Sequence, residues 1–231
     1  MRRLMFVILA ACGGSPPHAA SSSPDSEHHH HHGDHEPLGH RFEHADEWAP
    51  RFDDPARDAW QQPDRVVAAL ELAPGMTVAD IGAGTGYFEA RLSRAVGENG
   101  KVLALDIEPD MVRYMRERAA REKTPNVEAR QSAPDDPTLG AASVDRILIV
   151  DTWHHIPDRE AYAKKLAAAL KPGGAVFVVD FTQETDKGPP RAHRIPPDQV
   201  IRELQAGAID ASLLPVGLPD QFIVKAAASA R

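Results

Sequence analysis

Three glycines at alternate positions mark the stretch of this sequence that is best suited to hold a ligand. The stretch VADIGAGTGY, residues 78–87, places Gly82, Gly84 and Gly86 after an apolar run that contains Asp80. Between a strand and a helix, such glycines let the backbone approach a ligand closely. Asp106 follows Gly86 by twenty residues, where a carboxylate can accept hydrogen bonds from both hydroxyls of a ribose. The pattern therefore predicts a pocket for an adenosine-containing ligand.

The spacing of the glycines also bears on which ligand of this kind is bound. The nicotinamide dinucleotide fingerprint, GxGxxG, would require glycine at positions 82, 84 and 87. Position 87 is Tyr87. An NAD-dependent oxidoreductase is therefore the disfavoured interpretation of this turn.

Two adjacent histidines, His154 and His155, form a second group that could take part in a reaction. They follow the apolar run of residues 144–150 in the sequence DTWHHI, and we expect them at the same sheet edge as the glycine turn. Imidazole titrates near neutral pH and can act as a general base. The alternative interpretation is that one histidine of the pair only packs or bonds to the backbone.

The segments that must position these residues alternate between strand-like and helix-like patterns from residue 66 onward. This order predicts an α/β fold, a doubly wound, mostly parallel seven-stranded sheet with helices on both faces and an antiparallel C-terminal edge strand. Ligands of such sheets bind at the carboxyl ends of the strands. The expected strands are residues 77–81, 102–107, 127–131, 144–150 and 175–181, with a terminal hairpin of 209–214 and 222–226. The expected helices are residues 66–72, 87–96, 110–122, 159–170 and 197–206.

Four motifs in this order carry a resemblance to a known family. They are VADIGAGTGYF, VLALDIEPDMV, VDRILIVDTWHHI and LKPGGAVFVVDF, and together with their spacing they cover roughly residues 66–227. The chain resembles the class I S-adenosylmethionine-dependent methyltransferases. The resemblance implies that S-adenosylmethionine is the cofactor, that Asp80 orients its methionine end, that Gly82, Gly84 and Gly86 line it, and that Asp106 holds the ribose with Ile107 against the adenine.

The sequence departs from the family after the third expected strand. A Gly-Asp-Ala type of stretch, whose acid meets the adenine amino group, is common there, whereas this chain has Gln131-Ser132-Ala133. Ser132 is the expected stand-in, with Asp135 or Asp136 as alternatives. Asp151, the first residue of DTWH, completes the predicted cofactor-binding set.

The predicted reaction is an in-line methyl transfer to a small-molecule acceptor, which depends mainly on positioning. An NPPY-like signature for planar amino groups in nucleic acid or protein is absent, and the net charge of −8 gives no general attraction to nucleic acid. His154 and His155 are the predicted catalytic residues. Arg191 and Arg194 could meet an anionic substrate group, or belong to a solvated basic loop.

The N-terminal part of the chain has features of an exported protein. Residues 1–11, MRRLMFVILAA, combine a charged start and a short apolar run, which predicts a signal peptide. Leu9-Ala10-Ala11-Cys12 resembles a bacterial lipobox, which implies lipid on Cys12 and a cell-envelope lipoprotein facing the periplasm. The alternative is a cytoplasmic protein with a mis-called start. Because Cys12 is the single cysteine, an internal disulfide and a cysteine-based metal site are excluded.

Two further segments precede the expected sheet. Residues 12–35, rich in His, Ser and Pro, predict a disordered tether. Its run His28 to His32 could bind a divalent metal or be a leftover purification tag, but a solvated linker is the favoured interpretation. Residues 36–65 predict an N-terminal helical cap broken by Pro50 and Pro55, either a lid over the substrate or a hairpin that closes the core. Residues 66–231 are the predicted Rossmann-like methyltransferase domain.

A second class of function stays open, because S-adenosylmethionine is made in the cytosol whereas a lipoprotein domain usually faces away from it. The competing hypothesis is an envelope-anchored protein that binds a nucleoside-like ligand or a metal without chemistry. The sequence makes no prediction of the oligomeric state.

Overall fold

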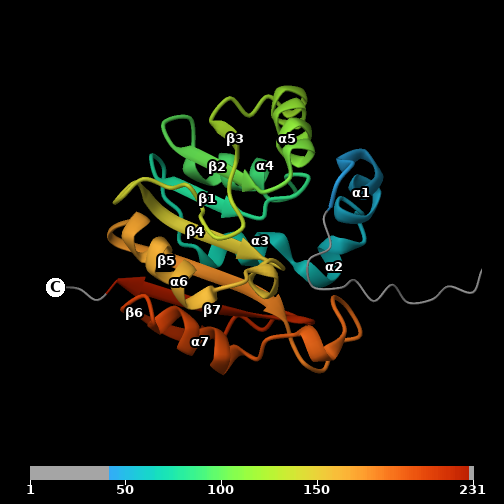
Figure 1. The fold of residues 1–231 in the computed structure, drawn as a ribbon. Coiled ribbons are helices and arrows are strands. Elements are labelled where there is room, and N and C mark those ends of the chain that lie inside the picture. Colours follow the sequence, from blue (N-terminus) through green and yellow to red (C-terminus); the bar gives the residue numbers. More distant parts are fainter. Residues whose placement is uncertain (1–41, 229–231) are drawn as a thin grey trace, which may run out of the picture. The chain divides into compact units, whose positions relative to one another are not determined.

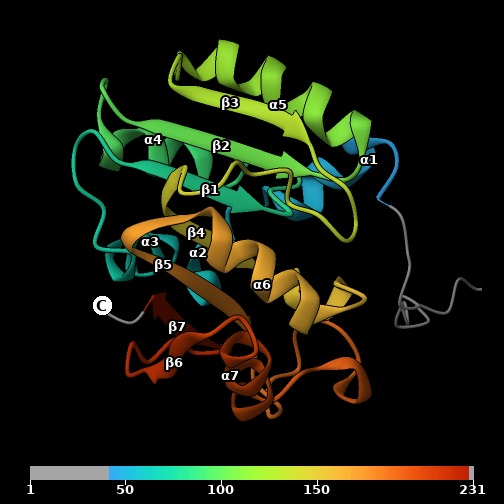
Figure 2. The ribbon, with the colours of Figure 1, turned by 60° about the vertical axis from the view of Figure 1, so that its left-hand side comes forward.

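The computed structural model describes residues 42–228, which form one mixed sheet covered by helices. The strand order is β3-β2-β1-β4-β5-β7-β6 (Figures 1 and 2). The strands are β1 (Thr77–Ile81), β2 (Lys101–Asp106), β3 (Val127–Gln131), β4 (Val144–Val150), β5 (Leu170–Phe181), β6 (Ile209–Leu214) and β7 (Gln221–Ala228). The helices are α1 (Ala45–Phe52), α2 (Arg57–Gln61), α3 (Pro63–Ala69), α4 (Glu89–Val96), α5 (Pro109–Glu122), α6 (Arg159–Ala169) and α7 (Pro197–Gln205). Two short 3-10 helices span Trp153–His155 and Arg191–His193.

The direction of the strands confirms the predicted fold class. Strands β1 to β5 pair in parallel, and β7 pairs antiparallel with both β5 and β6. The reversed strand thus lies one position inside the sheet, and β6 occupies the edge. Pairing of Phe181 with Gln221 brings the beginning of β7 to the carboxyl end of β5. The last strand therefore adds its first residue to the edge where ligands of such sheets bind.

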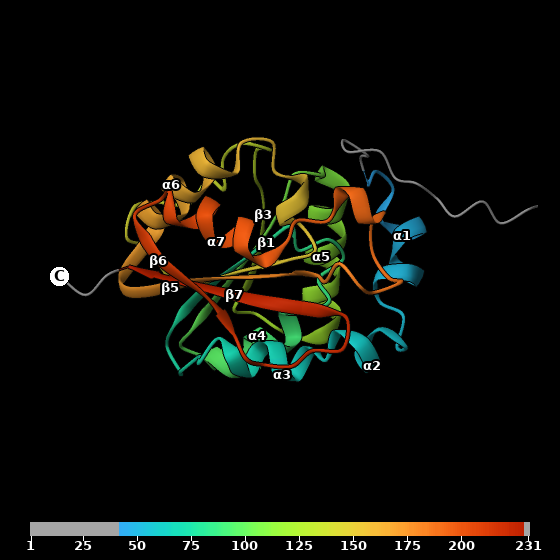
Figure 3. The ribbon, with the colours of Figure 1, turned by 90° about the horizontal axis from the view of Figure 1, so that it is seen from below.

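Alternation along the strands divides the core between the two faces of the sheet. On β4, Ile147 and Ile149 pack with residues of α6 and α7, whereas Leu148 and Val150 pack with residues of α3 and α4. Successive side chains of a strand point to opposite faces, and a sheet covered on both faces needs apolar residues at every position. Figure 3 shows α6 and α7 on one side of the sheet and α3 and α4 on the other.

The helical cap differs from the expectation in one respect. Pro50 lies inside α1 and does not break it, whereas Pro55 falls between α1 and α2, as predicted. Pro50 is the sixth residue of an eight-residue helix, so its missing N–H removes one hydrogen bond near the end of α1.

The boundary that we expected between residues 65 and 66, between the cap and the main domain, falls inside α3. Val66 of this helix is fully buried in the core.

Polar contacts fix α1 against the body of the fold. The backbone N–H of Ala45 donates to Asp110 Oδ2 of α5 over 2.7 Å, and Arg113 pairs with Asp46 at 3.0 Å. In Figure 1, β1 and β4 point towards the side on which α1 and α2 lie. The cap therefore sits at the edge of the sheet where we expect the ligand.

The predictions for residues 1–11, 12–35 and 36–41, including the lipid on Cys12, lie outside the described residues. Within residues 42–228, none of the helices is long and apolar enough to cross a membrane.

Candidate active site

The glycine turn joins β1 to α4 in a conformation that depends on glycine. Gly82, Gly84 and Gly86 have φ values of 73°, 58° and 85°, in the left-handed region. A Cβ at Gly82 would lie 2.3 Å from Oγ1 of Thr152, so this glycine is also required by contact with the segment after β4. The turn therefore joins the end of β1 closely to the residues that precede His154.

Asp106 is bound to the glycine turn by its side chain. Its Oδ2 accepts the N–H of Gly84 over 2.8 Å, and its Oδ1 accepts the N–H of Glu108 over 2.9 Å. Burial raises the pKa of this carboxyl, and the two backbone N–H donors oppose that effect. Each carboxylate oxygen has a second lone pair, so Asp106 can still accept hydrogen bonds from ligand hydroxyls.

The residues predicted to contact the adenine lie beside Asp106. The backbone N–H of Ser132 donates to the carbonyl of Asp106 over 2.9 Å, at the carboxyl ends of β2 and β3. Ile107 is a large apolar residue with 41 % of its surface exposed. An exposed aliphatic surface beside an acid is suited to an adenine ring on a ribose, so the arrangement fits the group that the sequence implies.

A second carboxyl lies next to Asp80, and the sequence analysis missed it. Glu89 begins α4, and both side chains are buried, Asp80 with 2 % and Glu89 with 5 % of its surface exposed. Burial raises the pKa of Asp80 to about 7, and burial together with the charge of Asp80 raises the pKa of Glu89. An acid in the first turn of a helix is ordinarily explained by the helix dipole, so the sequence alone gave no signal.

Asp151 follows β4 in a left-handed backbone conformation and contacts the cap. Its φ is 53°, its carboxylate accepts a hydrogen bond from the amide of Gln221 on β7, and Arg57 of α2 lies 3.7 Å away. Burial raises the pKa of Asp151 to about 7, and the charge of Arg57 opposes this. The charge of Arg57 also acts to lower the pKa of Asp80. Asp151 thus lies where α2, β4 and β7 meet, and its predicted contact with the cofactor stays a prediction.

His154 is held by a carboxylate. Its Nδ1 lies 3.1 and 3.0 Å from the two carboxylate oxygens of Asp180, at the end of β5, and the side chains of both residues are buried. Burial lowers the pKa of His154, but the bond to Asp180 and the charges of Asp180 and Asp151 outweigh it, so the net pKa is raised. Hydrogen bonding at Nδ1 fixes the ring and leaves Nε2 as the nitrogen that can exchange a proton.

His155 has different surroundings from His154. Its ring centroid lies 4.2 Å from that of His154 and 6.0 Å from that of Phe42. Phe42 packs in turn against Trp48 and Phe52, at 4.9 and 5.5 Å between centroids. The two predicted catalytic residues therefore lie together, with His155 facing the aromatic cluster of Phe42, Trp48 and Phe52.

The aromatic cluster also covers the glycine turn. A Cβ at Gly84 would lie 3.5 Å from the ring of Phe52. Asp53, which follows α1, accepts hydrogen bonds from Thr85 Oγ1 over 2.8 Å and from Arg118 over 2.7 Å. The residues after the cap helix α1 are thus bound to the turn itself, which favours a lid over the site.

Comparison with known proteins decides the family. A family model described as a methyltransferase domain matches residues 78–174. The crystal structure of an S-adenosylmethionine-dependent methyltransferase from Aquifex aeolicus is 31 % identical, covers 78 % of this chain and 97 % of that one, and superposes with a TM-score of 0.74. This chain belongs to the S-adenosylmethionine-dependent methyltransferases. S-adenosylmethionine is accordingly the cofactor of this protein, as the sequence predicted.

Curated relatives of this methyltransferase act on quinone-type molecules. The 2-methyl-6-phytyl-1,4-hydroquinone methyltransferase of Synechocystis is 32 % identical over 169 residues, which are 68 % of this chain and 48 % of that protein. The ubiquinone/menaquinone biosynthesis C-methyltransferase of Klebsiella pneumoniae is 33 % identical over 110 residues, 47 % of this chain and 44 % of that protein. This chain spans about half the length of these curated relatives.

Other solved structures share the fold alone. The [4+2]-cyclase SpnF superposes with a TM-score of 0.60 at 15 % identity, over 73 % of this chain and 80 % of that one. A cyclase is named for a reaction other than methyl transfer, so the fold by itself does not determine the chemistry.

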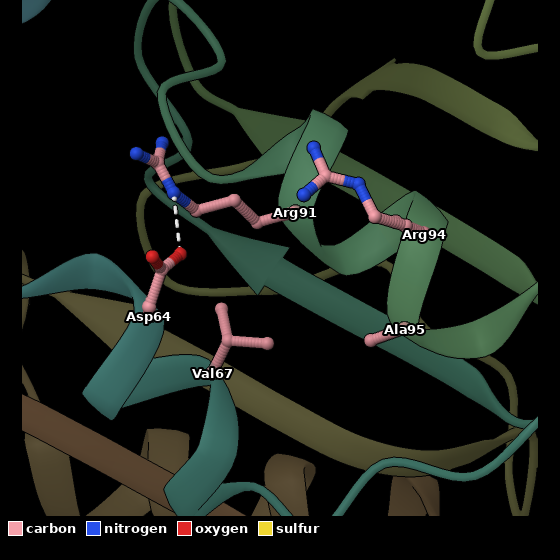
Figure 4. Close-up of a pocket in the computed structure, with 5 residues that line it drawn as sticks. All are labelled: Asp64, Val67, Arg91, Arg94 and Ala95. Atoms are coloured by element: carbon pink, nitrogen blue, oxygen red, sulfur yellow. Dashed lines mark hydrogen bonds and ion pairs between the residues drawn. The ribbon is translucent and has the colours of Figure 1, made fainter.

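Two other features of this methyltransferase lie apart from the predicted site. A shallow pocket of about 180 Å³ lies between α3 and α4, where Arg91 binds Asp64 over 3.0 Å (Figure 4). None of its lining residues, Asp64, Val67, Arg91, Arg94 and Ala95, belongs to the predicted site. Within residues 42–228, no group of three or more His, Cys, Asp or Glu side chains is placed to hold a metal ion.

In the basic loop after β5, the guanidinium of Arg194 is engaged by the loop itself, whereas the exposed Arg191 stays a candidate for a substrate anion. Arg194 donates hydrogen bonds to backbone carbonyls of its own loop, those of Thr182, Gln183, Thr185, Lys187 and Pro189. All three nitrogens of its guanidinium are thus used to fold the loop. Arg194 is therefore neither placed for a substrate anion nor part of a merely solvated loop.

Proposed function

We propose that this protein transfers the methyl group of S-adenosylmethionine to a small organic acceptor with an acidic hydroxyl, whose proton is taken by His154. The observation that carries the proposal is the buried pair of His154 and Asp180. It lies at the ends of β4 and β5, two residues beyond Thr152, which touches the glycine turn. This position beside the expected cofactor site supports the role of a general base for His154.

The described residues have separate roles in this proposal. When bound, S-adenosylmethionine supplies an electrophilic methyl group, and both electrons of the broken bond stay on sulfur. Asp180 keeps Nδ1 of His154 protonated, so Nε2 can accept the hydroxyl proton of the acceptor. Loss of that proton leaves an electron pair on the acceptor to form the new bond to carbon. The cap excludes water by covering the turn with Phe52 and by the bond of Asp53 to Thr85.

A hydroquinone or phenol is the acceptor class that we favour. Two curated relatives are named for quinone-type substrates, and the aromatic cluster of Phe42, Trp48 and Phe52 offers a surface for a ring next to His155. An arsenite methyltransferase of Halobacterium salinarum is 30 % identical over 116 residues, 50 % of this chain and 30 % of that protein. Arsenic is a soft centre that prefers thiolate ligands. This chain has a single cysteine, Cys12, to supply one. A phenolic acceptor is therefore the better match to the residues present.

Calorimetry and product analysis test the proposal. We expect the full chain to bind S-adenosylmethionine and not NAD, and to methylate members of a hydroquinone and phenol panel, detected by mass spectrometry. His154→Asn is expected to lower kcat by a factor of about 10²–10⁴ and to leave the affinity for S-adenosylmethionine unchanged. His193→Asn, in the exposed loop after β5, is the matched control. Full activity of His154→Asn would remove the base from the proposal, and ligand binding without any turnover would favour the non-catalytic binding protein.

We also propose that the protein is a cell-envelope lipoprotein. The support is the stretch MRRLMFVILAAC, with a charged start, an apolar run and a cysteine in a lipobox-like setting. Expression of the full chain in a bacterial host should give membrane-bound protein that becomes soluble on Cys12→Ser. Equal, soluble distribution of both forms would favour a cytoplasmic protein with a mis-called start. That outcome would also place the protein with its cofactor in the cytosol.

A further inference from the structure

Glu89 has a buried carboxyl that shares a hydrogen bond with the side chain of Asp80 and has no other side-chain partner among the described residues. An unsatisfied buried polar group is costly, and an unsatisfied carboxylate more so, because both the charge and the hydrogen bonds to water are lost. A proton shared with Asp80 relieves part of this cost in the ligand-free protein, and it leaves the other oxygens of the pair without a donor.

The carboxylate of Glu89 lies at the glycine turn. A Cβ at Gly86 would lie 3.2 Å from Oε2 of Glu89, so the carboxylate packs directly against the turn. The side chain of Glu89 also hydrogen-bonds to that of the buried Asp80, and the charge of Asp80 raises the pKa of Glu89 further. Two buried carboxyls thus converge where β1 passes into the turn.

The neighbouring cations are engaged elsewhere. Arg118, whose charge reaches Glu89, donates its hydrogen bonds to Asp53, Glu122 and the carbonyl of Thr85. Arg57, whose charge reaches Asp80, donates to Gln61 and to the carbonyl of Phe52. Neither guanidinium fills the hydrogen-bonding capacity of Glu89. A compact cation with several N–H donors is what this pair of carboxyls lacks.

We propose that Glu89, together with Asp80, binds the ammonium group at the methionine end of S-adenosylmethionine. The inference rests on the proposed function, which supplies a ligand with a primary ammonium at this turn. An ammonium has three N–H donors and one positive charge, so it would replace the proton shared by the two carboxyls, donate to the oxygens of Glu89 and offset the charge of both carboxylates. Glu89 is then a determinant of cofactor affinity beyond the acid of the glycine motif.

The test compares ligands with and without the ammonium. Glu89→Gln keeps the size of the side chain and removes its charge. We expect this substitution to lower the affinity for S-adenosylmethionine and S-adenosylhomocysteine by a factor of about 10–100. The affinity for methylthioadenosine, which has no amino-acid portion, should fall by less than about twofold. Glu98→Gln, an exposed glutamate after α4, is the matched control. Unchanged affinity for S-adenosylmethionine, or equal weakening of all three ligands, would overturn the inference.

A second measurement uses the unmodified protein and does not depend on the folding of a variant. Calorimetric titrations at pH 6 in two buffers of different ionisation enthalpy give the number of protons exchanged on binding. Because the buried carboxyls hold protons there, ammonium binding should release protons with S-adenosylmethionine and not with methylthioadenosine. Equal proton exchange for both ligands would contradict the inference. Failure of the unmodified protein to bind either ligand would instead reject the proposed function.

Discussion

Nδ1 of His154 lies 3.0 Å from Oδ2 of Asp180, and the two side chains expose 4 % and 1 % of their surface. The carboxylate therefore orients the imidazole and stabilises its protonated form. Phe181 donates its backbone N–H to Asp180 Oδ1 over 2.8 Å, which fixes the carboxylate in turn. Hydrogen bonds thus connect the backbone of β5 to the ring of His154.

Asp180→Asn should shift the pH dependence of catalysis. The base must be neutral to accept a proton, so activity rises as the pH passes through the raised pKa of His154. Removal of the carboxylate leaves burial as the dominant effect, which lowers that pKa. The rising limb of kcat/KM should therefore move to lower pH while the plateau falls about tenfold or more. A pH profile with an unmoved limb would mean that His154 does not titrate in the rate-limiting step.

Asp80→Asn should stabilise the ligand-free protein at alkaline pH. The folded-state pKa of about 7 lies above the unfolded value, so the folded protein binds more protons between about pH 4 and 7. Stability therefore falls as pH rises through that window, and the substitution should remove the fall, a gain on the order of 2–4 kcal/mol at pH 8. Urea denaturation at pH 5 and pH 8 measures it. Asp198→Asn, an exposed carboxylate paired with Arg202, should show no such gain.

Gly82→Ala should disrupt the turn. A Cβ there would meet Thr152 Oγ1 at 2.3 Å, and φ is +73°. We expect a loss of stability of about 1–3 kcal/mol and loss of cofactor binding. Gly75→Ala is the control, since Gly75 has φ +90° but nothing within 4 Å of its Cβ position. If thermal unfolding and titration give the same result for both variants, backbone strain alone, and not the contact with Thr152, is responsible.

Asp53→Ala should loosen the cap over the cofactor. This residue accepts hydrogen bonds from Thr85 and Arg118 and so ties the end of α1 to the glycine turn. Its loss should raise the dissociation rate of S-adenosylmethionine about 5–20-fold, as followed by stopped-flow fluorescence of Trp48. The neighbouring Asp54→Ala removes a local bond to the backbone of Ala56 and should leave that rate unchanged. Equal rates in both variants would argue for a cap that only closes the core.

Much of the fold was predictable because its strands are short apolar runs between turn residues. The expected bounds of β1, β3 and β4 agree with the structure to the residue. The beginning of β5 was not predictable, because the extension to Leu170 depends on pairing with Val144 of β4. The insertion of β7 between β5 and β6 likewise depends on packing between segments far apart in the chain.

The site was predictable only where a local motif marks it. The glycine turn and Asp106 follow a recognisable spacing, and the structure joins them by the bond from Gly84. No local sequence motif identifies Asp180 or Arg57. Asp180 lies beside His154 because of the sheet, and Arg57 lies beside Asp151 because of the position of the cap. Glu89 was hidden because an acid at a helix start has an ordinary explanation.

The reversal of β7 has a practical consequence for labelling this protein. Gln221 begins β7 beside Phe181 at the ligand edge, whereas Ala227 pairs with Ala175 near the opposite edge. At about 3.3 Å per residue, a dye or a surface linker attached after β7 starts roughly 20 Å from the reaction centre. A label there would therefore lie near the edge of the sheet opposite to the glycine turn and His154.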